Sequence, residues 1–123
     1  MKNPNFVLLY VKDPAASAAF YTRLLGRPAV DASENFAMLP LTGEVMLGLW
    51  AMADVQPSSV IMGGGSEIGF PAESHAAVDA CHREWSAQRL AIAQPPTQMD
   101  FGYTFVALDP DGHRLRVFHP NAG

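Results

Sequence analysis

The chain has 123 residues, of which 49% are hydrophobic and 16% are charged, and this composition is typical of one soluble globular domain spanning residues 1–123. Its formal net charge of −4, with no basic stripe, argues against a nucleic-acid partner. The longest apolar run, Phe6–Val11, is too short to span a bilayer, so we expect no membrane partner and a cytoplasmic location.

Strand and helix signals alternate along the first half of the chain. Asn5–Val11 is rich in branched and aromatic residues and is predicted to form a strand. Asp13 is a helix N-cap with Pro14 at the first helical position, and the helix is expected to end before Gly26. The core face of this helix is expected to carry Ser17, Phe20 and Leu24. Three more strands are predicted, at Val30–Asp31, Asn35–Leu39 and Glu44–Trp50, with a hairpin turn at residues 40–43.

A similar order of elements begins again after a break. Residues 51–66 include Pro57 and three consecutive glycines and show no apolar period, which predicts a flexible linker. Glu67–Ala72 is the next predicted strand, and Ser74 is the N-cap of a helix over His75–Arg89. One face of that helix carries Val78, Cys81, His82 and Trp85, where the single cysteine is expected to be a packed core thiol. The remaining predicted strands are Leu90–Ala93, which ends before Pro95 and Pro96, Tyr103–Leu108 and Arg114–Phe118.

The last two strands flank a hairpin turn at Asp109–Gly112. Proline presets one turn angle there, and the glycine can take a positive φ at low cost. Alternation along the last strand separates Arg114, Arg116 and Phe118 on one face from Leu115 and Val117 on the other. Arg116 is unusual, because a charge in mid-strand is costly unless it is paired or faces a wet cavity. The alternative is that Arg116 reaches solvent at a sheet edge.

The two halves of the chain share one pattern. A shift of 61 residues carries the first strand and helix of one half onto those of the other, and a shift near 68 aligns the last strands. Few residues are identical between the halves, so the repeat is one of pattern. We therefore predict an α+β fold of two βαβββ modules, at about 4–50 and 67–119, joined by a linker over about 51–66.

The motifs resemble those of a known family. The chain resembles the vicinal oxygen chelate superfamily in three segments, Leu8–Asp13, Ser17–Tyr21 and Asp109–His113. That superfamily includes glyoxalase I, extradiol dioxygenases, and fosfomycin and bleomycin resistance proteins. Phe101–Phe105 and Ser66–Phe70 are similar to the small phenazine-antibiotic resistance proteins of that superfamily, which bind an aromatic antibiotic without changing it. The resemblance implies curved half-barrel sheets, with cavities closed by pairing with a second chain in a homodimer.

The resemblance also bears on metal binding. In the metalloenzymes of the superfamily, four side chains from the first and last strands of the two modules converge on a divalent ion. The corresponding positions here hold Phe6, Gly48, Glu67 and Arg116. Only Glu67 could ligate a metal, and Arg116 carries a permanent positive charge where the cation would sit. We therefore expect no metal and no other cofactor, and we expect Glu67 to pair with Arg116.

Strand alternation places aromatic and thioether side chains on the face that would line the cavity. Such a lining suits a flat apolar ligand, because rings stack on one another and sulfur packs against ring edges, and the alternative is a solid core. Trp50 is the strongest candidate, and Phe101 and Tyr103 are expected to cover the cavity mouth from a loop. The candidate ligand-binding residues are Leu8, Tyr10, Met46, Gly48, Trp50, Glu67, Phe101, Tyr103, Arg116 and Phe118.

Three classes of function remain open at this point. The leading hypothesis is a metal-independent protein that binds and sequesters a planar aromatic molecule such as an antibiotic, and that is not an enzyme. The second is a metal-dependent lyase, dioxygenase or transferase of the same superfamily. The third is a ligand-sensing or interaction module. Fold alone does not separate these classes, so the site must do so.

Overall fold

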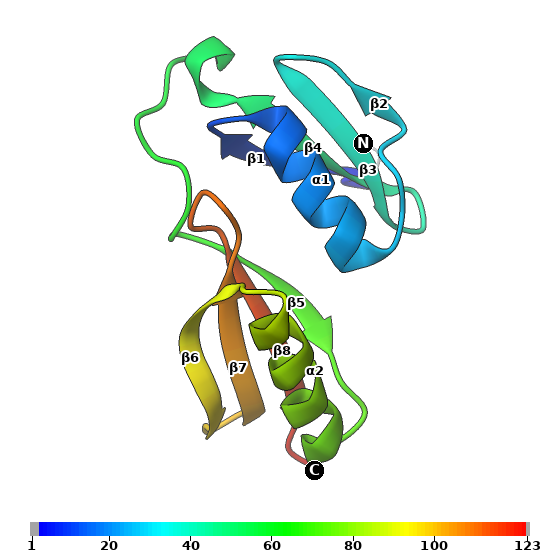
Figure 1. Ribbon diagram of the computed structural model, residues 1–123, viewed down its shortest axis with the longest axis vertical. Helices are drawn as coiled ribbons and strands as arrows, with labels where there is room; N and C mark the ends of the chain where they lie inside the picture. Colours follow the sequence, from blue (N-terminus) through cyan, green and yellow to red (C-terminus); the bar gives the residue numbers. More distant parts are fainter. Residues whose placement is uncertain (1–2, 123) are drawn as a thin grey trace. The chain divides into compact units, whose positions relative to one another are not determined.

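The computed structural model describes residues 3–122, so residues 1, 2 and 123 of the expected domain lie outside the described part. The chain divides after Gly63 into two compact units, called unit 1 and unit 2 (Figure 1). Unit 1 contains β1 (Phe6–Val11), α1 (Pro14–Leu25), β2 (Asp31–Ala32), β3 (Phe36–Thr42) and β4 (Val45–Ala51), followed by a 3-10 turn at Met52–Asp54. Unit 2 contains β5 (Glu67–Pro71), α2 (His75–Ala87), β6 (Ala91–Gln98), β7 (Gly102–Leu108) and β8 (Arg114–Pro120). Each unit has the βαβββ order, which confirms the predicted α+β class.

Each unit contains one four-stranded sheet, with strand order β1-β4-β3-β2 in unit 1 and β5-β8-β7-β6 in unit 2. Neither sheet is closed into a barrel. The first and last strands of each unit pair in parallel, with Phe6 opposite Met46 and Glu67 opposite Arg114. The two shifts inferred from the sequence, 61 and 68 residues, carry the first of these pairs onto the second. The register therefore confirms that Gly48 and Arg116 occupy equivalent places in the two units.

Both helices begin at the predicted caps. The Asp13 carboxylate accepts hydrogen bonds from the backbone N–H groups of Ala15 and Ala16, at 3.1 and 3.3 Å, and Gly26 ends α1 in the left-handed region at φ 69°. Ser74 Oγ accepts from the N–H of Ala77 at 3.0 Å. These local signals could be predicted because a cap satisfies the backbone groups of its own first turn.

The core face of α1 differs from the prediction. Pro14, Ser17 and Tyr21 are buried, and their spacing of three and four residues places them on one face of the helix. Phe20 and Leu24 are only half-buried. Phe20 lies beside this face and packs edge-on against the ring of Tyr21, with 5.0 Å between centroids.

One face of each sheet is buried against the helix of its unit. The buried strand residues on these faces are Leu9, Val11, Ala37, Leu39, Leu47 and Leu49 in unit 1, and Phe105, Ala107, Leu115 and Val117 in unit 2. Trp85 of α2 packs edge-on against Phe70 and Phe105, with 5.5 Å between ring centroids in each pair. The predicted alternation along β8 is confirmed. The opposite face of each sheet is free of its own helix, and the candidate site lies there.

Three proline-containing segments extend strands further than predicted. β3 continues through Pro40 to Thr42. β2 pairs with β3 only at Ala37 and Met38, so no strand within the described part of the chain pairs with that edge of β3 at Pro40, and the missing N–H of proline costs no hydrogen bond there. β6 continues through Pro95 and Pro96 for the same reason, since it is the edge strand of its sheet. Its register against β7 shifts around Gln94, where the ladder accommodates the prolines. β8 likewise continues to Pro120.

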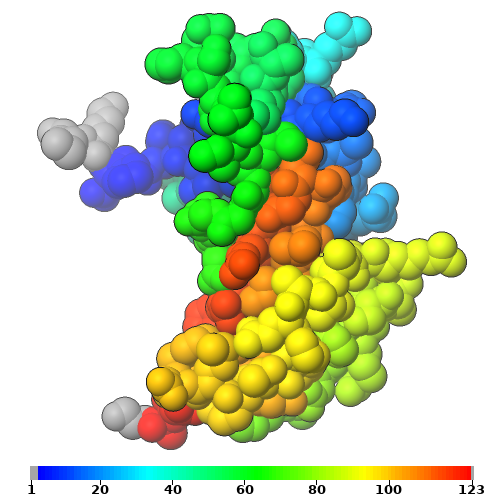
Figure 2. Space-filling model, turned by 90° about the vertical axis from the view of Figure 1, so that its left-hand side faces the viewer, coloured from blue at the N-terminus to red at the C-terminus, as the bar shows by residue number. Residues whose placement is uncertain are grey.

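The linker between the units is visible on the molecular surface, in green in Figure 2. Its Val60 and Ile61 are 92% and 67% exposed, whereas Val55 is buried. Among residues 3–122, no helix has both the length and the apolar character needed to cross a membrane.

Candidate functional site

The open face of unit 1 bears a cavity of about 350 Å³, called here the aromatic cavity. It is lined by Phe6, Leu8, Asn35, Phe36 and Trp50. β1 contributes Phe6 and Leu8 through its alternation, and Trp50 comes from the end of β4, where it pairs with Tyr10 of β1 and with Phe36 of β3. Phe6 and Leu8 are 40% and 45% exposed, so the cavity opens to solvent along β1.

Gly48 was predicted to contact the ligand, but it is buried beneath three side chains that line the aromatic cavity and is not itself part of the lining. A Cβ atom at this position would lie 2.5 Å from Phe6 Cε1, 2.7 Å from Leu8 Cδ2 and 3.3 Å from Phe36 Cζ. Real Cβ atoms essentially never approach other atoms that closely, so these side chains reach over the backbone only because residue 48 has none. The position that would hold a metal ligand in a metalloenzyme of this fold is thus covered by hydrocarbon.

Two other predicted residues of unit 1 lie beside the cavity rather than in its lining. Tyr10 meets the edge of the Trp50 ring, with 6.3 Å between centroids and 79° between planes, and so restrains the indole. Met46 lies two residues from Gly48 on the same face of β4. Asn35 and Phe36 line the cavity but were not predicted to do so from the sequence. Phe36 could have been found from the alternation of side chains along β3, because it lies opposite Trp50 of β4.

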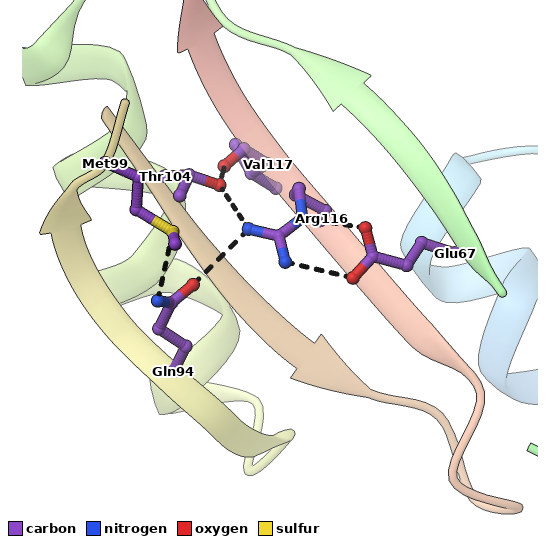
Figure 3. A network of polar contacts seen from close by, with 6 residues as sticks. All are labelled: Glu67, Gln94, Met99, Thr104, Arg116 and Val117. Carbon is purple, nitrogen blue, oxygen red and sulfur yellow. Dashed lines mark hydrogen bonds and ion pairs between the residues drawn. The ribbon is translucent and has the colours of Figure 1, made fainter. Parts of the chain in front are cut away.

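Unit 2 carries the arginine that was unusual in the sequence. Arg116 Nε lies 2.7 Å from Glu67 Oε1 and Arg116 Nη2 lies 3.0 Å from Glu67 Oε2, which is a two-pronged ion pair (Figure 3). Nη1 donates to Gln94 Oε1 at 3.3 Å and to Thr104 Oγ1 at 3.2 Å. The Arg116 side chain is 19% exposed and that of Glu67 33%. The predicted pairing is confirmed, and the alternative in which Arg116 only reaches solvent is wrong.

The pair has an electrostatic consequence for Glu67. Hydrogen bonding from Arg116 and the charges of Arg116 and Arg114 hold the pKa of the Glu67 carboxyl below its ordinary value, against a smaller opposing effect of burial. Glu67 is therefore ionised at neutral pH and neutralises one guanidinium.

A second cavity, of about 360 Å³, lies on the open face of unit 2 and is called here the guanidinium cavity. The residues that line it are Ala93, Gln94, Met99, Val106, Arg114 and Arg116. Gln94 Nε2 donates to the Met99 sulfur at 3.3 Å, so Gln94 connects Arg116 to Met99 (Figure 3). The ring of Phe101 lies with its centroid 5.6 Å from Arg116 Cζ, within the range of a cation–π contact.

Two further predicted residues of unit 2 occupy different surroundings. The Phe118 ring lies on the open face over Gly69, 3.3 Å from where a Cβ would be. Tyr103 was expected to cover the cavity from a loop, but it lies in β7 and faces α2. Its hydroxyl donates to Asp79 Oδ1 at 2.7 Å, its ring stacks on His75 with 4.6 Å between centroids, and the hydrogen bond to Asp79 raises the pKa of Tyr103. The structure therefore does not bring Tyr103 together with Arg116.

The donors at the four metal-equivalent positions do not fit a divalent ion. Phe6 and Gly48 offer no side-chain ligand, Glu67 gives both its oxygens to Arg116, and a guanidinium cannot ligate a cation. Within residues 3–122 no group of three or more His, Cys, Asp or Glu side chains is arranged to hold a metal.

Comparison with known proteins places this fold and site in context. The family model described as the Glyoxalase/Bleomycin resistance protein/Dioxygenase superfamily matches residues 3–117. The chain is 31% identical over 118 residues to the phenazine antibiotic resistance protein EhpR of Enterobacter agglomerans, a match covering 93% of this chain and 89% of that protein.

Solved structures agree with the family match. A protein from Agrobacterium tumefaciens with a solution NMR structure is 42% identical, with a TM-score of 0.87, and the match covers 99% of this chain and 100% of that one. Lactoylglutathione lyase from Agrobacterium tumefaciens, at 21% identity and a TM-score of 0.73, shares the fold over 97% of this chain and 94% of its own. Since the family model matches nearly the whole chain, the protein belongs to the Glyoxalase/Bleomycin resistance protein/Dioxygenase superfamily, as its motifs indicated.

Proposed function

We propose that this protein binds and sequesters a planar aromatic small molecule, an antibiotic of the phenazine or bleomycin type, without a metal and without changing the ligand chemically. Protection would follow from mass action, so it would require protein in stoichiometric amount. The similarity to a phenazine antibiotic resistance protein supports the ligand class, because 31% identity extends over nearly the whole of both chains.

The observation that carries the proposal is the aromatic cavity. Its volume of about 350 Å³ falls in the range of small-molecule sites. Its lining is formed by the rings of Phe6, Phe36 and Trp50 and the side chain of Leu8, with the polar amide of Asn35. Such a site gains affinity by stacking and by burial of apolar surface, and it holds no nucleophile or acid–base pair.

Metal independence is proposed from the ion pair in unit 2. The positive charge of Arg116 stands where a ligand of the metal would be needed, and Glu67 is already committed to it. Replacing a cation and its ligands by a guanidinium and a carboxylate keeps the strands joined without supplying a Lewis acid.

We also infer a homodimer. The linker side chains of Val60 and Ile61 are 92% and 67% exposed, and the open face of unit 1 exposes Phe6 and Leu8. Large apolar side chains exposed in this way support a surface of association, and a second copy of the chain is the partner proposed.

The proposal can be tested with the two tryptophans of the chain. The Trp85→Phe variant keeps only Trp50 as a fluorophore, and Trp50→Phe keeps only Trp85, which packs in the core of unit 2 against Phe70 and Phe105. Titration with phenazines, quinoxalines and glycopeptides should quench wild type and Trp85→Phe but not Trp50→Phe. The expected Kd for a planar member is below about 100 μM, near −5.5 kcal/mol.

The controls separate binding from catalysis. Circular dichroism should show both variants folded, and EDTA should leave the affinity unchanged. After unfolding of the complex, mass spectrometry should recover the ligand unchanged and in a molar amount that saturates with the protein. A product of altered mass would make the protein an enzyme, and the absence of any planar ligand binding below about 100 μM would remove the proposal.

A further inference from the structure

The guanidinium cavity of unit 2 contains more positive charge than its surroundings neutralise. Arg114 and Arg116 are two residues apart on the same face of β8, and both line the cavity. Its other lining residues, Ala93, Gln94, Met99 and Val106, are uncharged. Glu67 on the neighbouring strand is the carboxylate that meets this pair of arginines.

Glu67 is committed to one of the two arginines. The strand register places Glu67 directly opposite Arg114, and a cross-strand ion pair between them would be the simple expectation. The carboxylate instead gives both oxygens to Arg116, at 2.7 and 3.0 Å. Within residues 3–122, the Arg114 guanidinium donates to no group, and Arg114 is exposed at the cavity.

The arrangement separates the roles of the two arginines. Arg116 is held by Glu67, Gln94 and Thr104, so its position is set before any ligand arrives. Arg114 has its donors available at the edge of the same cavity, beside the apolar side chains of Met99 and Val106. A carboxylate fits the planar fork of a free arginine, and an aromatic ring fits the thioether and branched side chains next to it.

We propose that the guanidinium cavity receives the carboxylate end of an aromatic acid, with Arg114 as the residue that pairs with it. The inference rests on the proposed function and narrows its ligand class from planar aromatic compounds to those that carry an acidic group. Arg116, neutralised by Glu67, sets the shape of the cavity, and Arg114 supplies the positive charge and makes the ion pair.

A matched pair of probes tests this. Phenazine-1-carboxylate and phenazine-1-carboxamide share a ring system and differ in charge, and isothermal titration calorimetry measures both. Wild type should bind the carboxylate about tenfold more tightly than the carboxamide, the size expected of a charge-assisted pair. Arg114→Gln should abolish this preference and leave carboxamide affinity unchanged, and Arg114→Lys should restore part of it.

Arg83→Gln is the control for net charge, because Arg83 is an exposed residue of α2 on the other side of the same unit. It should behave as wild type. A second measurement needs no variant: raising the NaCl concentration should weaken carboxylate binding and leave carboxamide binding nearly constant.

The outcomes distinguish the two proposals. Equal affinity of wild type for both probes, or a carboxylate preference that persists in Arg114→Gln, overturns the inference while the proposed function stands. Failure of both probes to bind overturns the proposed function and this inference with it.

Discussion

Arg116 makes its ion pair diagonally across two strands. In the register its direct neighbour on β5 is Gly69, and Glu67 lies two residues away, opposite Arg114. Because Gly69 has no side chain, nothing on β5 stands between the guanidinium and the Glu67 carboxylate. Thr104 and Gln94, on the strands beyond β8 from β5, accept hydrogen bonds from the third guanidinium nitrogen, Nη1 of Arg116 (Figure 3). A charge in mid-strand is stable here because the neighbouring strands β5 and β7 and the next strand, β6, supply acceptors.

Replacement of Glu67 by glutamine tests the pair. Glu67→Gln should lower the free energy of unfolding by about 1 kcal/mol at pH 7, since the partly exposed pair is screened by solvent. The pKa of Glu67 is lowered on folding from an ordinary value of 4.5, so its contribution is present above that value and is lost as pH falls through the folded pKa. Urea unfolding should therefore show a difference between wild type and variant at pH 7 that is smaller at about pH 3, which lies below the ordinary pKa of 4.5.

Glu73→Gln is the control, because Glu73 is an exposed carboxylate of the same unit. It should leave the free energy of unfolding nearly unchanged at both pH values. A loss in Glu67→Gln that is equally large at both pH values would contradict an origin in the carboxylate charge.

Gly48 allows a second test at the residue scale. In Gly48→Ala the new methyl group would displace the tips of Phe6 and Leu8, which are exposed enough to move, so the free energy of unfolding should change by less than about 1 kcal/mol. Because Phe6 and Leu8 line the aromatic cavity, their displacement would change its shape, and affinity for a planar ligand should fall about tenfold, measured by Trp50 quenching. Gly65→Ala, in the linker with no atom within 4 Å of its Cβ, should bind as wild type. Undiminished binding by Gly48→Ala would place the ligand elsewhere.

At the scale of elements, edge position explains why some strands are longer than their sequences predict. Proline ends an interior strand, so the sequence predicts that each strand stops before it. Pro95 and Pro96 are instead tolerated because β6 has one neighbour, and Pro40 because β2 covers only part of β3. The extension of β6 past the prolines brings Gln98 opposite Tyr103, next to the turn that carries Met99 and Phe101. The length of these strands depends on which strands pair with them, and the sequence of a single segment does not contain that information.

The start of β7 is a tightly packed element that a substitution can test. A Cβ at Gly102 would meet the carbonyl oxygen of His119 and lie 2.8 Å from Pro120 Cα, both in the backbone of β8. Because backbone cannot swing aside, Gly102→Ala should lower the free energy of unfolding by roughly 2 kcal/mol in a thermal or urea experiment. Gly69→Ala, whose Cβ would touch only the movable Phe118 ring, should cost clearly less. Equal stability of the two variants would contradict the packing described for β7.

At the scale of the whole molecule, two units repeat one design with opposite chemistry. Unit 1 fills its open face with hydrocarbon around Gly48, and unit 2 fills the equivalent place with the Arg116 network. The equivalence of the positions follows from the shared register of the parallel strand pairs. One fold thus carries an apolar site and a charged site.

The proposed homodimer is tested on the whole chain. Light scattering after gel filtration should give about twice the chain mass of 13.3 kDa. The double substitution Val60→Asp with Ile61→Asp should shift the mass toward the monomer, because it places charge on the exposed apolar part of the linker. Val30→Asp, at a residue 57% exposed in unit 1, should leave the mass unchanged. A monomeric wild type at all concentrations would end the dimer proposal.

Local signals in the sequence determined the βαβββ order, both helix caps and the faces of β8, because caps, turns and alternation act over a few neighbouring residues. The charge of Arg116 in an apolar strand also indicated that it is paired or faces a wet cavity, because an isolated charge there would be costly, and the structure shows the pair. The tertiary structure alone decided that Phe36 and Asn35 join the aromatic cavity, that Tyr103 turns to Asp79, and that Arg114 is left without the carboxylate opposite it. These outcomes depend on which strands lie side by side and in what register, and that is settled by packing between segments far apart in the chain.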